Sequence, residues 1–533
     1  MSAEQWDLTG TISPYLDRHM LFPLLEFVDR LIAEGRVNYS AADVTAARLD
    51  LLRPTNMVDY AIDIYKNKKE SVPEEWTVQK QNVMAELATL EQKCAPFTKL
   101  VAEQAVRRVY CFHSCCIYSH FIIFVQEKLI ANGNWNMSSL SQIDAAVTQE
   151  VVDSYRQLAR FQFDCGDYAT SRSMLANYIA LFAHPPQQQQ QQEESYGGGG
   201  GDDHGTTTDY AEQHASNTSS NNNNNNNVGN KNMYYLRSVD DTTMLNVLWG
   251  RLACEILVLD WEAANIALEA VKTALEGMVT AGHITPLVAL QQRTWVLHWS
   301  LFVYWNSNQS GLEKFVELVL YTDKYKQAVT TNAPHLLRYL TAAVLLCKRR
   351  LNNQGSASDI RKLLKHLVYV MQDCEYSDPI VEFVESVTIK FDFDASQTKL
   401  AECESVLSAD FFLCQQATLF MEEARFFVFE NYCRIHNKME ISALGSKLAM
   451  KQDAAERWIV DLIIRNPDLS AVIDNDTVVM GNNAPASVYE QVRSATMSHN
   501  VRSATLVQNL QTMLNESRKD KAKRERLTRE DEY

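Results

Sequence analysis

The chain of 533 residues has no long hydrophobic run. Its most apolar short stretch, residues 121–125, is far below the roughly 20 residues that a membrane-spanning helix needs. Residues 1–7 contain neither a basic region nor an apolar one, so no secretory signal is expected. We therefore expect a protein that makes no membrane contact and acts in the cytoplasm, with a nuclear pool left open.

Motifs of catalysis are also lacking. The densest glycine stretch, residues 197–201, follows polyglutamine and does not open a helix, so it is not a phosphate-binding loop. There is no His-Glu-x-x-His, no nucleophile elbow and no Cys-x-x-Cys. Neighbouring acids such as Glu422-Glu423 are typical of a solvated surface. We predict no enzyme, no catalytic residue, no cofactor and no small-molecule substrate.

The 11 cysteines, without a signal peptide, predict free thiols in a reducing compartment. One cluster contains Cys111, His113, Cys115, Cys116 and His120. Its members form i, i+4 pairs on different faces of an apolar helix, whereas a structural zinc site usually has paired Cys-x-x-Cys spacing. Buried cysteines that act as small hydrophobic residues are the favoured interpretation, with zinc as the alternative. No metal site is predicted.

Acidic residues exceed basic ones, and the net charge of −16 argues against general coating of nucleic acid. The tail is a local exception. Its basic residues are Arg518, Lys519, Lys521, Lys523, Arg524, Arg526 and Arg529, of which the first six are the predicted contact residues. This run could contact RNA phosphates or an acidic partner, and a solvated helix end or a disordered tail is the simpler interpretation.

Most of the chain has the apolar spacing of helical hairpins. Residues 158–169 and 252–264 resemble each other, because each places a small turn and an aromatic residue between two apolar helices. Tetratricopeptide-like pairs share this pattern. No strict period of 34 residues is visible. We predict a mainly α fold, an irregular right-handed α-solenoid of helical hairpins (TPR-like).

Residues 184–232 interrupt the helices with runs of glutamine, glycine and asparagine. Almost nothing there can be buried to offset the entropy of ordering, so a disordered insertion in a loop is expected. A self-associating polar tract is the alternative.

Residues 437–483 predict a winged helix. Ile441, Leu444 and Leu448 follow one helical face, and a second helix continues until Asn466-Pro467. The period then changes to alternation, which predicts a tight two-stranded hairpin with its turn at Asn475-Asp476. Two helices followed by an unrelated loop are the alternative.

This wing is expected to bind protein rather than DNA. Residues 440–466 carry equal numbers of basic and acidic side chains, whereas a groove reader normally carries a basic stripe. An exposed strand edge can pair with a neighbour. The residues predicted to bear that contact are Val472, Ile473, Val478 and Val479.

Short motifs of one family are spread along the chain. They are Asp7-Leu8-Thr9, Pro14-Tyr15-Leu16-Asp17-Arg18-His19, Phe22-Pro23-Leu24-Leu25-Glu26-Phe27, Thr55-Asn56-Met57-Val58-Asp59-Tyr60, Gln291-Gln292-Arg293-Thr294-Trp295, His298-Trp299-Ser300-Leu301-Phe302, Leu337-Arg338-Tyr339-Leu340, Phe391-Asp392-Phe393-Asp394, Ala455-Glu456-Arg457-Trp458-Ile459-Val460 and Val479-Met480-Gly481-Asn482-Asn483. Together they resemble the e subunit of eukaryotic translation initiation factor 3, a PCI-domain family. The matches span nearly the whole chain except the insertion and the basic tail.

The resemblance implies helical repeats that end in a winged helix, which pairs with winged helices of sister subunits. It also implies a factor that binds the small ribosomal subunit and recruits mRNA and initiator tRNA without catalysis. The expected division of the chain is 1–183 N-terminal repeats, 184–232 insertion, 233–409 repeats of the PCI module, 410–484 winged helix, 485–516 C-terminal helices and 517–533 charged tail.

Two other functions remain open from the sequence. One is a PCI scaffold of the proteasome lid or the COP9 signalosome, which has a similar fold. The other is a winged-helix nucleic-acid binder that acts alone. Motifs at both termini favour the initiation factor.

Overall fold

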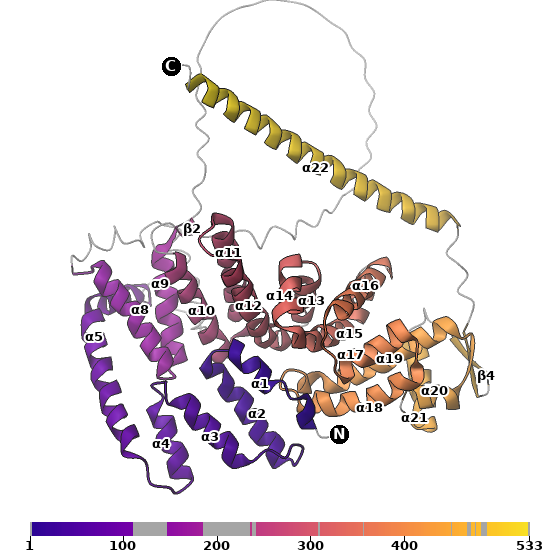
Figure 1. The fold of residues 1–533 in the computed structure, drawn as a ribbon, viewed down its shortest axis with the longest axis horizontal. Coiled ribbons are helices and arrows are strands. Elements are labelled where there is room, and N and C mark those ends of the chain that lie inside the picture. Colours follow the sequence, from indigo (N-terminus) through magenta and orange to yellow (C-terminus); the bar gives the residue numbers. More distant parts are fainter. Residues whose placement is uncertain are drawn as a thin grey trace, which may run out of the picture. The chain divides into compact units, whose positions relative to one another are not determined.

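The structure of the protein is a computed structural model (Figure 1). It describes residues 3–109, 146–184, 235–236, 241–307, 310–354, 357–448, 450–465, 471–474, 476–480 and 488–530. The predicted cysteine and histidine cluster at 111–120 and most of the 184–232 insertion lie outside these ranges. Contacts divide the chain into two compact units. The first contains residues 1–389 and 402–423, and the second contains residues 390–401 and 424–533.

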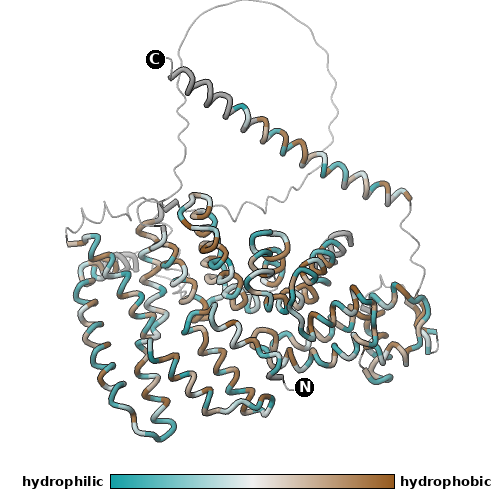
Figure 2. Tube along the Cα trace, in the orientation of Figure 1, coloured by the Kyte–Doolittle hydropathy of each residue, from teal (hydrophilic) through white to brown (hydrophobic). Residues whose placement is uncertain are grey.

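The first unit is helical. Its α-helices are α1 Thr9–Ile12, α2 Leu21–Ala33, α3 Ala41–Leu52, α4 Val58–Asn67, α5 Glu74–Val109, α8 Gln149–Asp164, α9 Tyr168–Phe182, α10 Asp241–Leu257, α11 Trp261–Ala281, α12 Pro286–Asn306, α13 Gly311–Leu320, α14 Asp323–Asn332, α15 Leu337–Gln354, α16 Ala357–Asp373 and α17 Pro379–Glu385. Short 3-10 turns are η1 Ala3–Trp6, η2 Ser13–Tyr15, η3 Arg18–Met20 and η5 Pro334–Leu336. Apolar and polar residues alternate along the helices, so that most helices have an apolar stripe and a polar one (Figure 2).

Successive hairpins pack in sequence order, α8 on α9, α9 on α10 and α10 on α11 (Figure 1). The turns within the two similar segments, residues 158–169 and 252–264, have the same geometry. Gly166 and Leu259 both have a left-handed backbone, with φ of 91° and 64°. In the next position, Asp167 and Asp260 each cap the following helix by accepting a backbone N–H, from Thr170 and Ala263. The helical solenoid is confirmed.

The N-terminal segment packs against helices far along the chain. The Tyr15 ring stacks on His298 of α12, with ring centroids 4.2 Å apart. The backbone carbonyl oxygen of Tyr15 accepts a hydrogen bond from the Trp299 indole at 3.0 Å. Further back, the carbonyl of Trp6 accepts a 2.8 Å hydrogen bond from the Arg338 guanidinium of α15. Residues 6–20 are therefore part of the helical core.

Arg338 is the centre of a buried ion network. Its guanidinium donates to Asp378 at 2.6 Å and to Asp410 at 3.1 Å, and all three side chains are buried. The Tyr339 hydroxyl also donates to Asp410. Burial raises the pKa of the Asp410 carboxyl, and the neighbouring guanidinium opposes that rise. Such a network is stable only because each charge has partners.

The strands β1 Ala183–His184 and β2 Tyr235–Leu236 form an antiparallel pair, with His184 opposite Tyr235. They bring together the two ends of the intervening residues. In the part of the chain that the structure describes, no helix is long and apolar enough to cross a membrane, and no group of three or more metal-ligating side chains occurs.

The second unit contains β3 Lys438–Glu440, α20 Ile441–Lys447, α21 Gln452–Arg465, β4 Ala471–Asp474, β5 Thr477–Met480 and α22 Val488–Glu530. The helices α18 Phe393–Ala409 and α19 Ala417–Ile435 contribute residues to both units. The expected two-stranded hairpin is a three-stranded sheet in the order β3-β5-β4. The expected separate C-terminal helices and tail are a single helix, because residues 488–530 contain neither Pro nor Gly to interrupt it.

Candidate subunit interface

The helical part of the winged helix follows from the predicted spacing. Ile441, Leu444 and Leu448 are all buried, as are Ala455 and Ile459 on the second helix. The helices α20 and α21 come close at Gly445. A methyl group built there would lie only 3.1 Å from the Ala455 Cβ atom, so the glycine permits the tight crossing.

The sheet is held by β5, which pairs with both neighbours. Its partners are β3, where Met439 lies opposite Val478, and β4, where Ile473 lies opposite the same residue. The backbone N–H of Ile441 donates to the Asp476 carbonyl at 2.9 Å, which fixes the start of α20 to the turn of the wing. The central position of β5 leaves β3 and β4 as the two edges.

The four predicted contact residues form two cross-strand pairs, Val472 with Val479 and Ile473 with Val478. Their exposures differ sharply. The Val472 side chain is 64% exposed, whereas Val478 is fully buried against the core of the wing. Ile473 and Val479 are half-buried. Val472 is therefore the one member of the set that presents a large apolar surface.

The two sheet edges differ chemically. On β3, the exposed side chains are Lys438 and Glu440, and charges of this kind discourage pairing with another chain. On β4, the exposed Val472 has no lysine beside it in the strand Ala-Val-Ile-Asp. The free edge of β4 has no strand partner among the described residues. The sequence predicted the strand but not which of its edges is free.

Further exposed apolar side chains lie on α21. Val460 and Ile464 are one turn apart on the outer face of the helix, and Ile464 is largely exposed. The sequence-based prediction missed this pair because it followed only the inward stripe. The signal that could have found it was two β-branched residues at i, i+4 on an otherwise charged face.

The predicted basic residues all lie on α22, towards its C-terminal end. Arg518 is exposed. The same helix exposes an apolar set nearer its start, with Leu506, Leu510 and Met513 at i, i+4, i+7. This spacing puts the three residues on one face of the helix.

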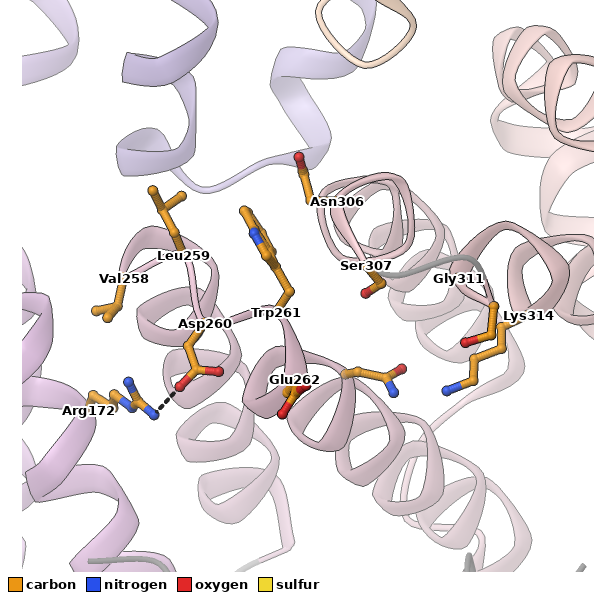
Figure 3. Close-up of a pocket in the computed structure, with 12 residues that line it drawn as sticks. Arg172, Val258, Leu259, Asp260, Trp261, Glu262, Asn306, Ser307, Gly311 and Lys314 are labelled. Carbon is orange, nitrogen blue, oxygen red and sulfur yellow. Dashed lines mark hydrogen bonds and ion pairs between the residues drawn. The ribbon is translucent and has the colours of Figure 1, made fainter. Parts of the chain in front are cut away.

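The first unit contains an open pocket of about 580 Å³ (Figure 3). It lies between the α10–α11 turn and the start of α13. Arg172 reaches one side of it and bonds Asp260 at 2.7 Å, and a second contact at 2.7 Å joins Arg172 to the buried Glu255. None of the twelve lining residues is His or Cys. The Asp260 carboxylate is engaged by Arg172 and by the helix cap, so the arrangement supports the turn.

The described cysteines are free thiols, most of them buried. Burial raises the pKa of the Cys94 thiol to about 11 and that of Cys433 to about 12. Cys433 contacts the Met439 sulfur at 3.9 Å, inside the wing. These thiols stay protonated at neutral pH and serve as packing groups.

Comparison with known proteins agrees with this architecture. The family model described as "eIF3 subunit 6 N terminal domain" matches residues 7–162, and the PCI domain model matches residues 400–482. Helical repeats that end in a winged helix, together with these matches, define a scaffold-type PCI protein.

The chain is similar to the E subunit of eukaryotic translation initiation factor 3 from Aspergillus terreus, with 32% identity over 93% of this chain and 92% of the relative. It is 33% identical to the E subunit from Bombyx mori, with 92% of each chain covered. The E subunit from Drosophila ananassae is also 33% identical, over 92% of this chain and 91% of the relative. The chain belongs to the E-subunit family of eukaryotic translation initiation factor 3, and it is a scaffold subunit of that multi-subunit factor.

Proposed function

We propose that the chain joins its sister subunits through the free edge of β4, without catalysing a reaction. The exposed Val472, on an edge strand whose one charged side chain is Asp474 at the turn end, carries this proposal. A partner strand that paired there would satisfy the open backbone groups and bury the valine. Val460 and Ile464 add apolar surface within the same winged helix.

In this proposal the assembled factor acts in the cytoplasm, where it binds the small ribosomal subunit and supports recruitment of mRNA and initiator tRNA. The basic end of α22 adds a contact with RNA or with an acidic partner. Membership in the E-subunit family supports this assignment. The predicted division into repeats, insertion, winged helix and C-terminal region is also part of the proposal.

The test replaces Val472 with Lys in the tagged full-length protein. The side chain is exposed, so the fold should survive, whereas a partner strand would have to bury the charge. We expect the recovery of sister subunits to fall about tenfold or more, as at an interface hot spot. The measurement is quantitative mass spectrometry of the co-purified complex, with a thermal melt of the purified subunit.

Leu287→Lys is the matched control, because Leu287 is at least as exposed as Val472 but lies on α12 of the first unit. It should leave the recovery unchanged. Normal stoichiometry with Val472→Lys would exclude pairing through β4. Val479→Pro is less informative, because β5 pairs on both sides and proline there would unfold the wing itself.

A further inference from the structure

An exposed patch of aromatic and basic side chains lies on α14 and α16 of the first unit. On α16, Lys365, His366 and Tyr369 share one face at i, i+1 and i+4, and all three are exposed. Tyr321, just before α14, and Lys326, within it, extend this face. We call these five residues the tyrosine–lysine patch. The helices α14 and α16 contact each other.

Contacts within the patch hold its rings in place. The Lys326 ammonium lies 4.2 Å from the centroid of the Tyr369 ring, a cation–π contact. The Tyr321 ring meets His366 edge to face, with centroids 5.9 Å apart and planes at 74°. Tyr321 and Tyr369 nevertheless remain 57% and 54% exposed. Two tyrosine rings are thus kept ordered at the surface without being buried.

The patch itself carries two ammonium groups, those of Lys326 and Lys365, and no carboxylate. Residues 311–373 contain ten Lys and Arg against five Asp and Glu. Two of these cations are engaged elsewhere, because Arg338 is buried against Asp378 and Asp410 and Lys324 pairs with Glu276. Three exposed carboxylates flank the patch in sequence: Glu317 one turn before Tyr321, Asp323 two residues after it, and Asp373 one turn beyond Tyr369.

We propose that the tyrosine–lysine patch binds single-stranded RNA. Exposed rings beside ammonium groups are the two elements of such sites, because bases stack on the rings and the cations contact the phosphates. An acidic peptide would need only the lysines and would leave the exposed tyrosines unexplained. A duplex has its bases already stacked on one another. Because the chain belongs to a translation factor, the single-stranded nucleic acid that it would meet is RNA rather than DNA. The patch is independent of the β4 edge.

The experiment uses the full-length purified protein and a 4-thiouridine oligonucleotide of about 15 nucleotides, the upper range for one binding fold. Cross-linked peptides are mapped by mass spectrometry, and affinity is measured by fluorescence anisotropy at several salt concentrations. We expect cross-links in the peptides that contain Tyr321 and Tyr369. Tyr369→Ala should weaken binding on the order of tenfold. Lys365→Gln should lower the salt dependence by about one phosphate contact.

Matched controls separate the patch from the basic end of α22. Tyr489→Ala removes a tyrosine that is exposed on α22, and it should leave the affinity unchanged. Cross-links confined to residues 518–529, or unchanged binding by Tyr321→Ala and Tyr369→Ala, would overturn the proposal. So would loss of a sister subunit in these variants with normal RNA binding, because the patch would then hold a protein. Failure of the β4 test does not affect this outcome.

Discussion

At the scale of single residues, the two equivalent turns of the solenoid show how sequence can oppose backbone geometry. Gly166 adopts its left-handed conformation without penalty, because it has no Cβ atom. Leu259 adopts the same conformation with a branched side chain that is 65% exposed. A non-glycine residue pays about 1–2 kcal/mol in this region. The α10–α11 turn is therefore strained, while the α8–α9 turn is not.

Leu259→Gly should stabilise the protein by about 0.5 to 1 kcal/mol, because the strain removed exceeds the extra entropy that glycine gives the unfolded chain. Little burial is lost. The measurement is the urea midpoint of the first unfolding transition. The reciprocal change, Gly166→Ala, should destabilise, since its new methyl group meets the Met57 Cε atom at 3.2 Å. A lower midpoint for Leu259→Gly would show that the leucine stabilises the turn.

At the scale of elements, the helices and strands that could be predicted from the sequence are those determined by hydrophobic periodicity and turn residues. The paired hairpins, α20, α21, β4 and β5 follow such local patterns. The strand β3 was missed, because Lys-Met-Glu has no alternating signal of its own and becomes a strand by pairing with β5. Which edge of the sheet is free depends on that pairing. The positions of the four proposed interface residues on β4 and β5 could thus be predicted, but not their different exposures.

The family motifs have structural roles that spacing could not reveal. Leu337-Arg338-Tyr339-Leu340 supplies the buried network that holds Trp6 and the two aspartates. His298-Trp299 holds the N-terminal segment through Tyr15. Partners separated by some 300 residues of sequence are invisible to periodicity, so only the folded chain shows why these motifs are there.

The pairing of α12 with η5 predicts a pH dependence. The Nε2 atoms of His298 and His335 lie 2.8 Å apart, and burial lowers their pKa values to about 3 and about 4. In the unfolded chain both titrate near 6.5. Between pH 7 and 5 the unfolded state therefore binds protons that the folded state does not. Stability should fall with decreasing pH, by about 2 kcal/mol for each histidine.

Urea midpoints at pH 7, 6 and 5 measure this slope. His335→Gln removes one titrating group and should make the slope shallower. Leu287→Gln, at an exposed position on α12 that carries no titratable group, is the control and should leave the slope as it is. An equal slope in the His335→Gln variant would mean that other groups cause the pH dependence.

At the scale of the whole molecule, the residues that stabilise the core differ from the residues that are exposed for binding. The first unit owes its integrity to stacked helices and buried ion pairs, while the second presents an open sheet edge and a long exposed helix. The net charge of −16 hides a basic segment at residues 311–373 and another at the end of α22. Binding surfaces of opposite character can therefore exist in one acidic protein.

The pairing of β1 with β2 predicts that the intervening sequence is dispensable for folding. His184 and Tyr235 are already opposite each other, and α9 packs directly on α10. Replacing residues 185–234 with an Asn-Gly turn should therefore leave the first unit folded. A shorter connection costs less closure entropy. The free energy of unfolding should therefore increase by about 2 kcal/mol, which is measured as a higher urea midpoint.

Co-purification of sister subunits should be unchanged, because neither β4 nor the tyrosine–lysine patch includes any replaced residue. A control replaces residues 185–234 with a Gly/Ser linker of equal length. It should behave like the wild type in stability, which separates the effect of length from that of composition. Loss of complex incorporation in both variants, with normal melting, would assign a binding function to the glutamine and asparagine runs. Loss of folding in the short variant alone would show that the β1–β2 pair cannot close as a tight hairpin.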